Sequence, residues 1–296
     1  MDNKKIIYYT DELNEEFSTV KIEPREIDEN YKYIHKNPLW NVGSFFVHQI
    51  LSLPIKIGYA KLKFRFKVVG KEKYKPYKKQ GFFVYGNHTQ SFGDTFFISN
   101  SLYPKRNFMI VNPENVSIKG MGNFVQTLGA IPIPTKRNGM KNFLEAIEKR
   151  IKQGYSITIF PEAHIWPYYT KIRPFKSVSF KYPVEQNVPI FCATNTYQSY
   201  GKNNDKIKIV MYIDGPFFPD KNLTPREQKE QLRNIAYETM CKRSENSNIE
   251  FIKYVKKESV YEGVIKKWWK KRINIMWIRD TINCNCSDYI ICCGKK

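Results

Sequence analysis

The chain has 296 residues, of which 42% are hydrophobic, enough for one large domain or two small domains with a substantial core. Its net charge of +21 predicts an anionic partner, such as nucleic acid, a membrane surface or a phosphorylated substrate. Four of the six cysteines lie in the last 13 residues, which is not the pattern of a disulfide framework. Because the sequence has no apolar signal segment and no apolar run of about 18 residues, we expect an intracellular protein without a clear membrane span.

Residues 1–37 are polar, and the first 30 hold nine acidic and four basic side chains, so we expect an arm with little core of its own. Residues 38–60 predict an amphipathic, membrane-proximal helix that bends or ends near Pro54. Its apolar face combines Val42, Phe45, Phe46, Ile50, Leu53 and Ile57, and polar residues interrupt it at Asn41, Ser44, His48, Gln49 and Lys56. The alternatives are a helix that faces the core, a helix in the plane of a membrane, and a membrane span.

From residue 61 to about 250, expected strands alternate with expected helices, which predicts a single α/β domain with a mixed sheet flanked by helices. The first strand, 61–69, alternates apolar with basic side chains. Later strands are expected at 81–86, 107–111, 130–134, 155–160, 188–193 and 206–213, and helices at 94–102, 120–128, 138–152 and 224–242. The last helix begins with a capping box. Residues 251–296 form a basic, aromatic extension whose cysteines lack the usual spacing of a zinc site.

A polar loop follows the apolar strand at 81–86 and contains a histidine and an aspartate. His88 suits the role of general base near neutral pH, and Asp94 suits that of a carboxylate that fixes its tautomer. Another short strand ends at Phe160, Pro161 and Glu162, and two polar loops at strand ends commonly form one site in α/β proteins. Gly-Asn-His also occurs among metal ligands of metallophosphoesterases, but no Asp-x-His precedes it in this sequence.

Four sequence blocks between about 60 and 245 resemble, in order, those of glycerolipid acyltransferases of the 1-acyl-sn-glycerol-3-phosphate (lysophosphatidate) acyltransferase type. The first block contains Asn87, His88 and Asp94, and the second is the stretch that ends at Lys136 and Arg137. The third is Phe160-Pro161-Glu162, where Ala163 replaces the glycine of the family. Downstream matches are Pro174-Phe175-Lys176 and Val188-Pro189-Ile190.

The resemblance implies that His88 and Asp94 are catalytic, that the donor is an acyl thioester of CoA or acyl carrier protein, and that the acceptor is a lysophospholipid. It implies no metal and no other cofactor. The sequence departs from the family at two points: five residues instead of four separate His88 from Asp94, and an arginine expected to hold the acceptor phosphate is missing after Glu162. We therefore consider a wider set of substrate-binding candidates: Asn87, Lys136, Arg137, Phe160, Pro161, Glu162, His164, Lys171 and Arg173.

These implications place the protein in phospholipid biosynthesis at the cytoplasmic face of the cell membrane, as a peripheral or monotopic protein with an anionic membrane surface as partner. One alternative is a related acyltransferase that acts on glycerol 3-phosphate or another lysolipid. The rival class is a non-catalytic protein that binds polyanions or nucleic acid through its positive charge. Since the sequence has no nucleic-acid-binding motif, and its aromatic residues mostly alternate into apolar faces, no nucleic acid is expected.

Overall fold

The computed structural model describes residues 5–18, 22–91, 93–201 and 206–257. Its contacts divide the chain into one unit of Met1–Ile6 and Asp11–Lys253, and a second of Ile7–Thr10 and Tyr254–Lys296. A two-stranded sheet pairs β1 (Lys5–Tyr9) with β9 (Ile252–Lys256), neither of which the sequence analysis expected. The extension expected at 251–296 thus begins with a strand, and its basic aromatic stretch and cysteines lie outside the described residues.

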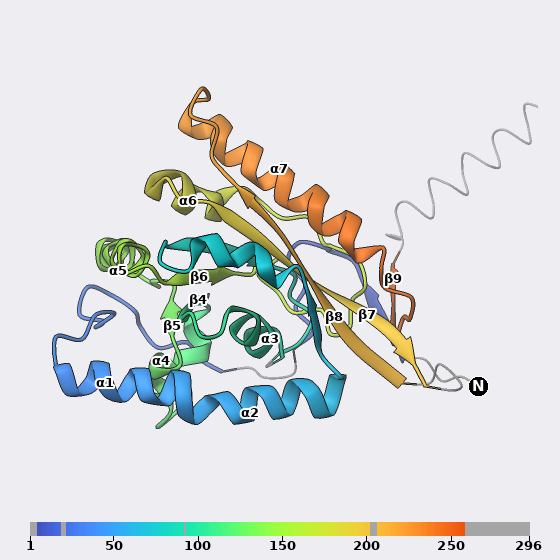
Figure 1. Cartoon of the computed structure of the whole chain (residues 1–296), viewed down its shortest axis with the longest axis horizontal. Helices are drawn as coiled ribbons and strands as arrows, with labels where there is room; N and C mark the ends of the chain where they lie inside the picture. Colours follow the sequence, from blue (N-terminus) through green and yellow to red (C-terminus); the bar gives the residue numbers. More distant parts are fainter. Residues whose placement is uncertain (1–4, 19–21, 92, 202–205, 258–296) are drawn as a thin grey trace, which may run out of the picture. The chain divides into compact units, whose positions relative to one another are not determined.

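The described part of the larger unit contains a seven-stranded sheet with the order β2-β8-β7-β3-β6-β4-β5. Neighbouring strands run parallel except β7 and β8, which form a long antiparallel pair (Figure 1). The prediction of one mixed-sheet α/β domain is therefore confirmed. The strand bounds are β2 Lys67–Val69, β3 Phe82–Gly86, β4 Asn107–Val111, β5 Ala130–Pro132, β6 Ser156–Ile159, β7 Ile190–Tyr200 and β8 Lys206–Phe217.

Helices cover both faces of this sheet, because the central strands carry large apolar side chains on each side. Phe83 and Tyr85 of β3 pack in a core cluster with α5 and α7, whereas Phe82 and Val84 pack in a second cluster with α3. Figure 1 shows α5, α6 and α7 on one side of the sheet and α3 on the other. The bounds are α3 Gly93–Leu102, α4 Gly122–Thr127, α5 Met140–Lys152, α6 Lys181–Gln186 and α7 Pro225–Ser244.

These helices agree with the predicted ones, apart from α6, which the sequence analysis did not expect. The capping box predicted at the start of α7 is present, with Thr224 and Glu227 each bonded to the backbone of the other. Short 3-10 turns complete the connections at Lys71–Tyr77, Pro113–Val116, Arg137–Gly139 and Val178–Phe180.

The N-terminal arm contributes two side chains to the core of the domain, which the sequence analysis did not foresee. Ile27 and Tyr33 are buried in the same cluster as α5 and α7. The Tyr33 hydroxyl donates to the Pro132 carbonyl at 2.9 Å, and the Ile27 carbonyl accepts from the Thr135 amide at 3.1 Å. The arm has no core of its own because its few apolar side chains fill the edge of the domain at β5.

Residues 38–63 form one run of helix, comprising α1 (Pro38–Phe46), a π-helical segment (Val47–Leu51), α2 (Ser52–Gly58) and a second π-helical segment (Tyr59–Lys63). Pro54 lies inside this run, shortly after the first π-helical segment, and does not end it. The strand predicted at 61–69 was wrong except for Lys67–Val69. Ala60 and Phe64 are one helical turn apart and both are buried in the cluster with α3, so tertiary packing overrides the alternation.

As far as Lys56, this helical run buries polar side chains, whereas most of its apolar side chains face outward. Ser44, His48, Gln49 and Lys56 are buried, whereas Leu39 is 81% and Leu62 is 89% exposed. Burial and the nearby charges of Lys56 and Arg106 lower the pKa of His48 to about 3, so its imidazole is neutral in the folded protein. The interpretation as an ordinary core-facing amphipathic helix was therefore wrong. Within the described residues, none of the helices combines the length and apolar character that crossing a bilayer requires.

Candidate active site

The two polar loops singled out in the sequence leave the same edge of the sheet. β3 and β6 are parallel neighbours, with Tyr85 opposite Ile159, so the loops that follow them emerge side by side. The His88 ring stacks on the Phe160 ring with centroids 4.4 Å apart and planes 12° apart. Gly86, at the end of β3, lies close to α3, because a Cβ atom at that position would be only 2.9 Å from the Ile98 side chain.

His88 and Asp94 are in direct contact despite the extra residue between them. His88 Nδ1 lies 3.0 Å from an oxygen of Asp94 near the start of α3. That oxygen also accepts hydrogen bonds from the amides of Thr89 at 2.6 Å and Gln90 at 2.8 Å. The loop thus curls around the carboxylate. The small size of Gly93 matters in this loop, because a Cβ atom at that position would meet the Phe97 ring at 2.9 Å.

The geometry orients the imidazole for proton transfer. Asp94 is fully buried, and its second oxygen accepts a hydrogen bond from the Asn195 side chain at 2.9 Å. The His88 side chain is 15% exposed. Because Nδ1 is held by the carboxylate, Nε2 is the nitrogen that remains to accept a proton from a substrate.

Asn195 and Tyr197 on β7 support this loop and were missed in the sequence analysis. Asn87 and Asn195 exchange two hydrogen bonds, of 3.0 and 2.8 Å, between side chain and backbone. The Tyr197 hydroxyl donates to the Thr89 hydroxyl at 2.8 Å and accepts from the Gln90 side chain at 3.0 Å. The available signal was the polar run Thr194-Asn195-Thr196, which directly follows the apolar stretch at 190–193. Because β7 runs parallel to β3, with Ala193 opposite Gly86, this run lies beside the loop that follows β3.

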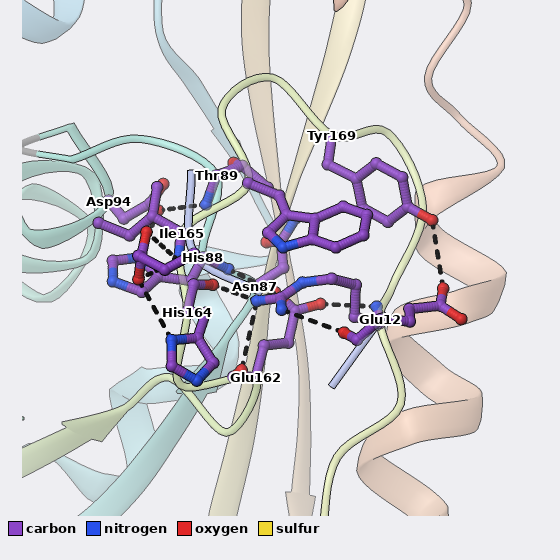
Figure 2. Close-up of polar contacts among 12 residues, drawn as sticks. Glu12, Asn87, His88, Thr89, Asp94, Glu162, His164, Ile165 and Tyr169 are labelled. Atoms are coloured by element: carbon purple, nitrogen blue, oxygen red, sulfur yellow. Dashed lines mark hydrogen bonds and ion pairs between the residues drawn. The ribbon is translucent and has the colours of Figure 1, made fainter. Parts of the chain in front are cut away.

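Glu162 belongs to the loop that follows β6, and its buried side chain connects this loop to the one that carries His88 (Figure 2). One carboxylate oxygen accepts from the His88 amide at 2.9 Å and the other from the Arg173 amide at 2.8 Å. Burial raises the pKa of Glu162, and the positive charge of Arg173 opposes this rise. The Arg173 side chain is itself buried, and its guanidinium donates to the carbonyls of Glu162 and His164. Ala163 has a φ of 63°, a conformation that glycine adopts more readily.

The structure brings some of the expected substrate-binding residues together and leaves others apart. Asn87, Glu162 and Arg173 are buried and position the loops around His88, so their contact with an acceptor stays a prediction. Pro161 and His164 are partly exposed beside Glu162. Lys136 and Arg137 follow β5, which is separated from β3 by β6 and β4. Together with Lys171, they are exposed.

Comparisons with known proteins find a similarity for the part of the chain that contains these loops. Residues 65–194, which include His88, Asp94 and Glu162, match the family model described as Acyltransferase. Among solved structures, it is similar to the 1-acyl-sn-glycerophosphate (LPA) acyltransferase PlsC from Thermotoga maritima, with 18% identity over 71% of this chain and 89% of that chain and a TM-score of 0.48. No curated protein matches the chain significantly.

Proposed function

We propose that the protein transfers a fatty acyl group from an acyl thioester, on CoA or acyl carrier protein, to the hydroxyl of a lysophospholipid. The first candidate acceptor is 1-acylglycerol 3-phosphate, which gives phosphatidate. The observation that carries this proposal is the contact of 3.0 Å between His88 and Asp94 at the end of β3, inside an acyltransferase domain. The net charge of +21 supports a phosphate-bearing acceptor, and glycerol 3-phosphate or another lysolipid is the alternative.

In the proposed mechanism, His88 acts as the general base. Its Nε2 takes the proton of the acceptor hydroxyl while the hydroxyl oxygen attacks the thioester carbonyl. The resulting imidazolium is stabilised by the Asp94 carboxylate on Nδ1. When the tetrahedral intermediate collapses, the carbon–sulfur bond breaks and the thiolate leaves with the proton from His88. The proposed reaction uses no covalent enzyme intermediate, metal ion or cofactor.

The acceptor phosphate needs cationic or hydrogen-bonding partners near His88. Arg173 is unsuited to this role in the described conformation, because its buried guanidinium is occupied by backbone carbonyls near Glu162. His164 is partly exposed and lies on the loop that is hydrogen-bonded to His88 through Glu162 and Trp166, whereas Lys136 and Arg137 follow β5. His164 is therefore the preferred candidate.

An acceptor panel tests the proposed function. We expect purified protein to release thiol from palmitoyl-CoA or palmitoyl-acyl carrier protein when lysophosphatidate is added, with phosphatidate detected by mass spectrometry. Glycerol 3-phosphate and lysophosphatidylcholine serve as comparison acceptors. Release that is the same with and without every acceptor would indicate thioester hydrolysis and contradict acyl transfer. Salt-sensitive DNA binding without thiol release would instead favour the non-catalytic alternative.

We also propose that the helical run at 38–63 lies on an anionic membrane surface at the cytoplasmic face of the membrane. Its outward face combines apolar side chains with two exposed lysines, Lys61 and Lys63. Apolar side chains favour burial at the lipid boundary, and each basic residue near an anionic surface contributes about 1 kcal/mol. The exposed apolar residues are Leu39, Val42, Phe45, Phe46, Ile50, Leu51, Ile55 and Leu62.

Liposome flotation tests this membrane proposal. We expect the triple variant Leu39→Gln/Val42→Gln/Ile55→Gln to bind phosphatidylglycerol-containing vesicles at least about tenfold more weakly, because each removed side chain loses apolar burial worth about 1.5–3 kcal/mol when complete. The matched control is Val178→Gln, which removes an exposed apolar side chain outside the helical run. Equal flotation of the two variants, or no preference of the unmodified protein for anionic vesicles, would contradict the proposal.

A further inference from the structure

A segment of the N-terminal arm crosses the loop that follows β6. We call residues 11–18 the N-terminal strap. The Phe17 amide donates to the Ile165 carbonyl at 3.2 Å, and the Trp166 indole donates to the Glu15 carbonyl at 2.8 Å. The rings of Phe17 and Trp166 meet edge to face with centroids 5.2 Å apart. The strap is therefore packed on the loop and is not a detached arm.

Within this contact, the carboxylate of Glu16 binds to two donors of the loop. One oxygen lies 3.3 Å from Nδ1 of His164, and both oxygens lie 3.1 Å from the Ile165 amide nitrogen. The amide of Ser18 donates to the carboxylate from within the strap. An imidazole and a backbone amide that converge on one anion are groups that can also bind a phosphate oxygen. Glu16 thus marks an anion-binding site.

This anion site is directly coupled to the loop that carries the general base. The residue after Ile165, Trp166, donates its amide to the His88 carbonyl at 3.2 Å, and Tyr168 donates its amide to the Thr89 carbonyl at 3.0 Å. Glu162, just before the site, accepts from the His88 amide. Figure 2 shows His88, Glu162 and His164 on these adjoining loops. A ligand held at His164 would therefore lie beside the catalytic loop.

We propose that the phosphate of the acceptor binds to the His164 imidazole and the Ile165 amide, and that Glu16 is an internal competitor that occupies this site until the acceptor displaces it. The identity of the ligand as a phosphate-bearing acceptor rests on the function proposed above. The strap thereby regulates access of the acceptor to the site, where the His164 imidazole and the Ile165 amide take the place of the arginine that the resemblance led us to expect after Glu162.

The energetics allow this exchange. The side chains of Glu16 and His164 are 34% and 31% exposed, and contacts between such solvent-accessible polar groups are weak. A phosphate monoester carries a charge of about −1.5 to −2 and three acceptor oxygens, so it offers His164 and Ile165 stronger charge-assisted hydrogen bonds than a carboxylate does. The carboxylate of Glu16 is therefore a weak occupant that a phosphate can replace.

The chain offers a matched control within the same strap. Glu12 carries the same charge as Glu16 and also packs against the loop, but its carboxylate contacts the Tyr169 hydroxyl at 3.4 Å. The backbone carbonyl of Glu12 accepts a hydrogen bond from the Arg173 guanidinium at 3.4 Å, so the contacts described for Glu12 lie away from the His164 imidazole and the Ile165 amide. Glu12→Gln therefore changes the net charge and the strap in the same way without uncovering the proposed site.

The test is a binding titration that needs no turnover. The imidazole resonances of histidine-labelled protein are followed by NMR as glycerol 3-phosphate or inorganic phosphate is added. We expect Glu16→Gln to bind glycerol 3-phosphate about two- to fivefold more tightly than the unmodified protein, the change that corresponds to loss of an exposed ion pair. Glu12→Gln should leave the affinity unchanged, and His164→Ala in the Glu16→Gln background should remove the gain.

The proposed anion site would be contradicted if Glu16→Gln and Glu12→Gln changed the affinity for glycerol 3-phosphate equally, or if the gain in affinity persisted after the loss of His164. Equal affinities for glycerol 3-phosphate and inorganic phosphate would overturn its assignment to the acceptor. Binding as expected in a protein that transfers no acyl group would refute the proposed function and leave the anion site standing. Turnover of lysophosphatidate with a KM that Glu16→Gln does not lower would refute the role of Glu16 and leave the function standing.

Discussion

Replacing His88 with alanine is expected to lower kcat for acyl transfer by about 10²–10⁴-fold, because the reaction loses its general base. The measurement is acceptor-dependent thiol release from the purified variant under saturating palmitoyl-CoA. The fold should survive, since the imidazole contacts only the Phe160 ring and Asp94 among the side-chain interactions described for it. Circular dichroism and thermal unfolding check this point. A His88→Ala protein that turns over at the unmodified rate would exclude the mechanism.

Two further variants separate base chemistry from the general loss of a histidine. Asp94→Asn should lower kcat with little change in KM for the acyl donor, because an amide neither fixes the tautomer nor stabilises the imidazolium as a carboxylate does. His35→Ala is the matched control: this imidazole stacks on Trp40 and contacts Gln126, away from the catalytic loop. Its activity on detergent-dispersed substrate should remain near that of the unmodified protein.

Replacing Glu162 with alanine is expected to lower the free energy of unfolding by about 3–5 kcal/mol, the usual cost of removing one partner of a buried ion pair. The carboxylate lies 3.8 Å from the Arg173 guanidinium, and both side chains are 1% exposed. The variant leaves a buried cation without its carboxylate and leaves the amides of His88 and Arg173 without their acceptor. Chemical denaturation followed by circular dichroism measures the change.

The Arg173→Met variant completes a double-mutant cycle for this pair. If the two side chains stabilise each other, Glu162→Ala combined with Arg173→Met should cost less than the sum of the single changes. Arg226→Met, at an exposed position at the start of α7, is the control and should change the free energy of unfolding by no more than about 0.5 kcal/mol. Additive single effects would show that Glu162 acts only through the backbone amides.

The sequence predicted the central strands and most helices because their patterns are local. The apolar run at β3 is buried on both faces, as a central parallel strand requires, and α5 shows its apolar stripe facing the core. Patterns failed where two periodicities overlapped. Phe64 satisfies both the alternation of a strand and the i, i+4 spacing with Ala60, and only packing against α3 selects the helix for residues 59–63.

The sequence by itself predicted the mixed-sheet α/β domain and singled out His88 and Asp94 as candidate site residues, because these predictions depend on residue types in a fixed order along the chain. Only the tertiary structure decided that Asp94 reaches His88, that Arg173 is enclosed with Glu162, and that Glu16 lies against His164. These contacts depend on how loops fold back over strand ends, and the last one joins residues 148 positions apart. The tertiary structure also decided that the helical run at 38–63 turns polar side chains inward, because burial depends on the packing of neighbouring elements and not on periodicity alone.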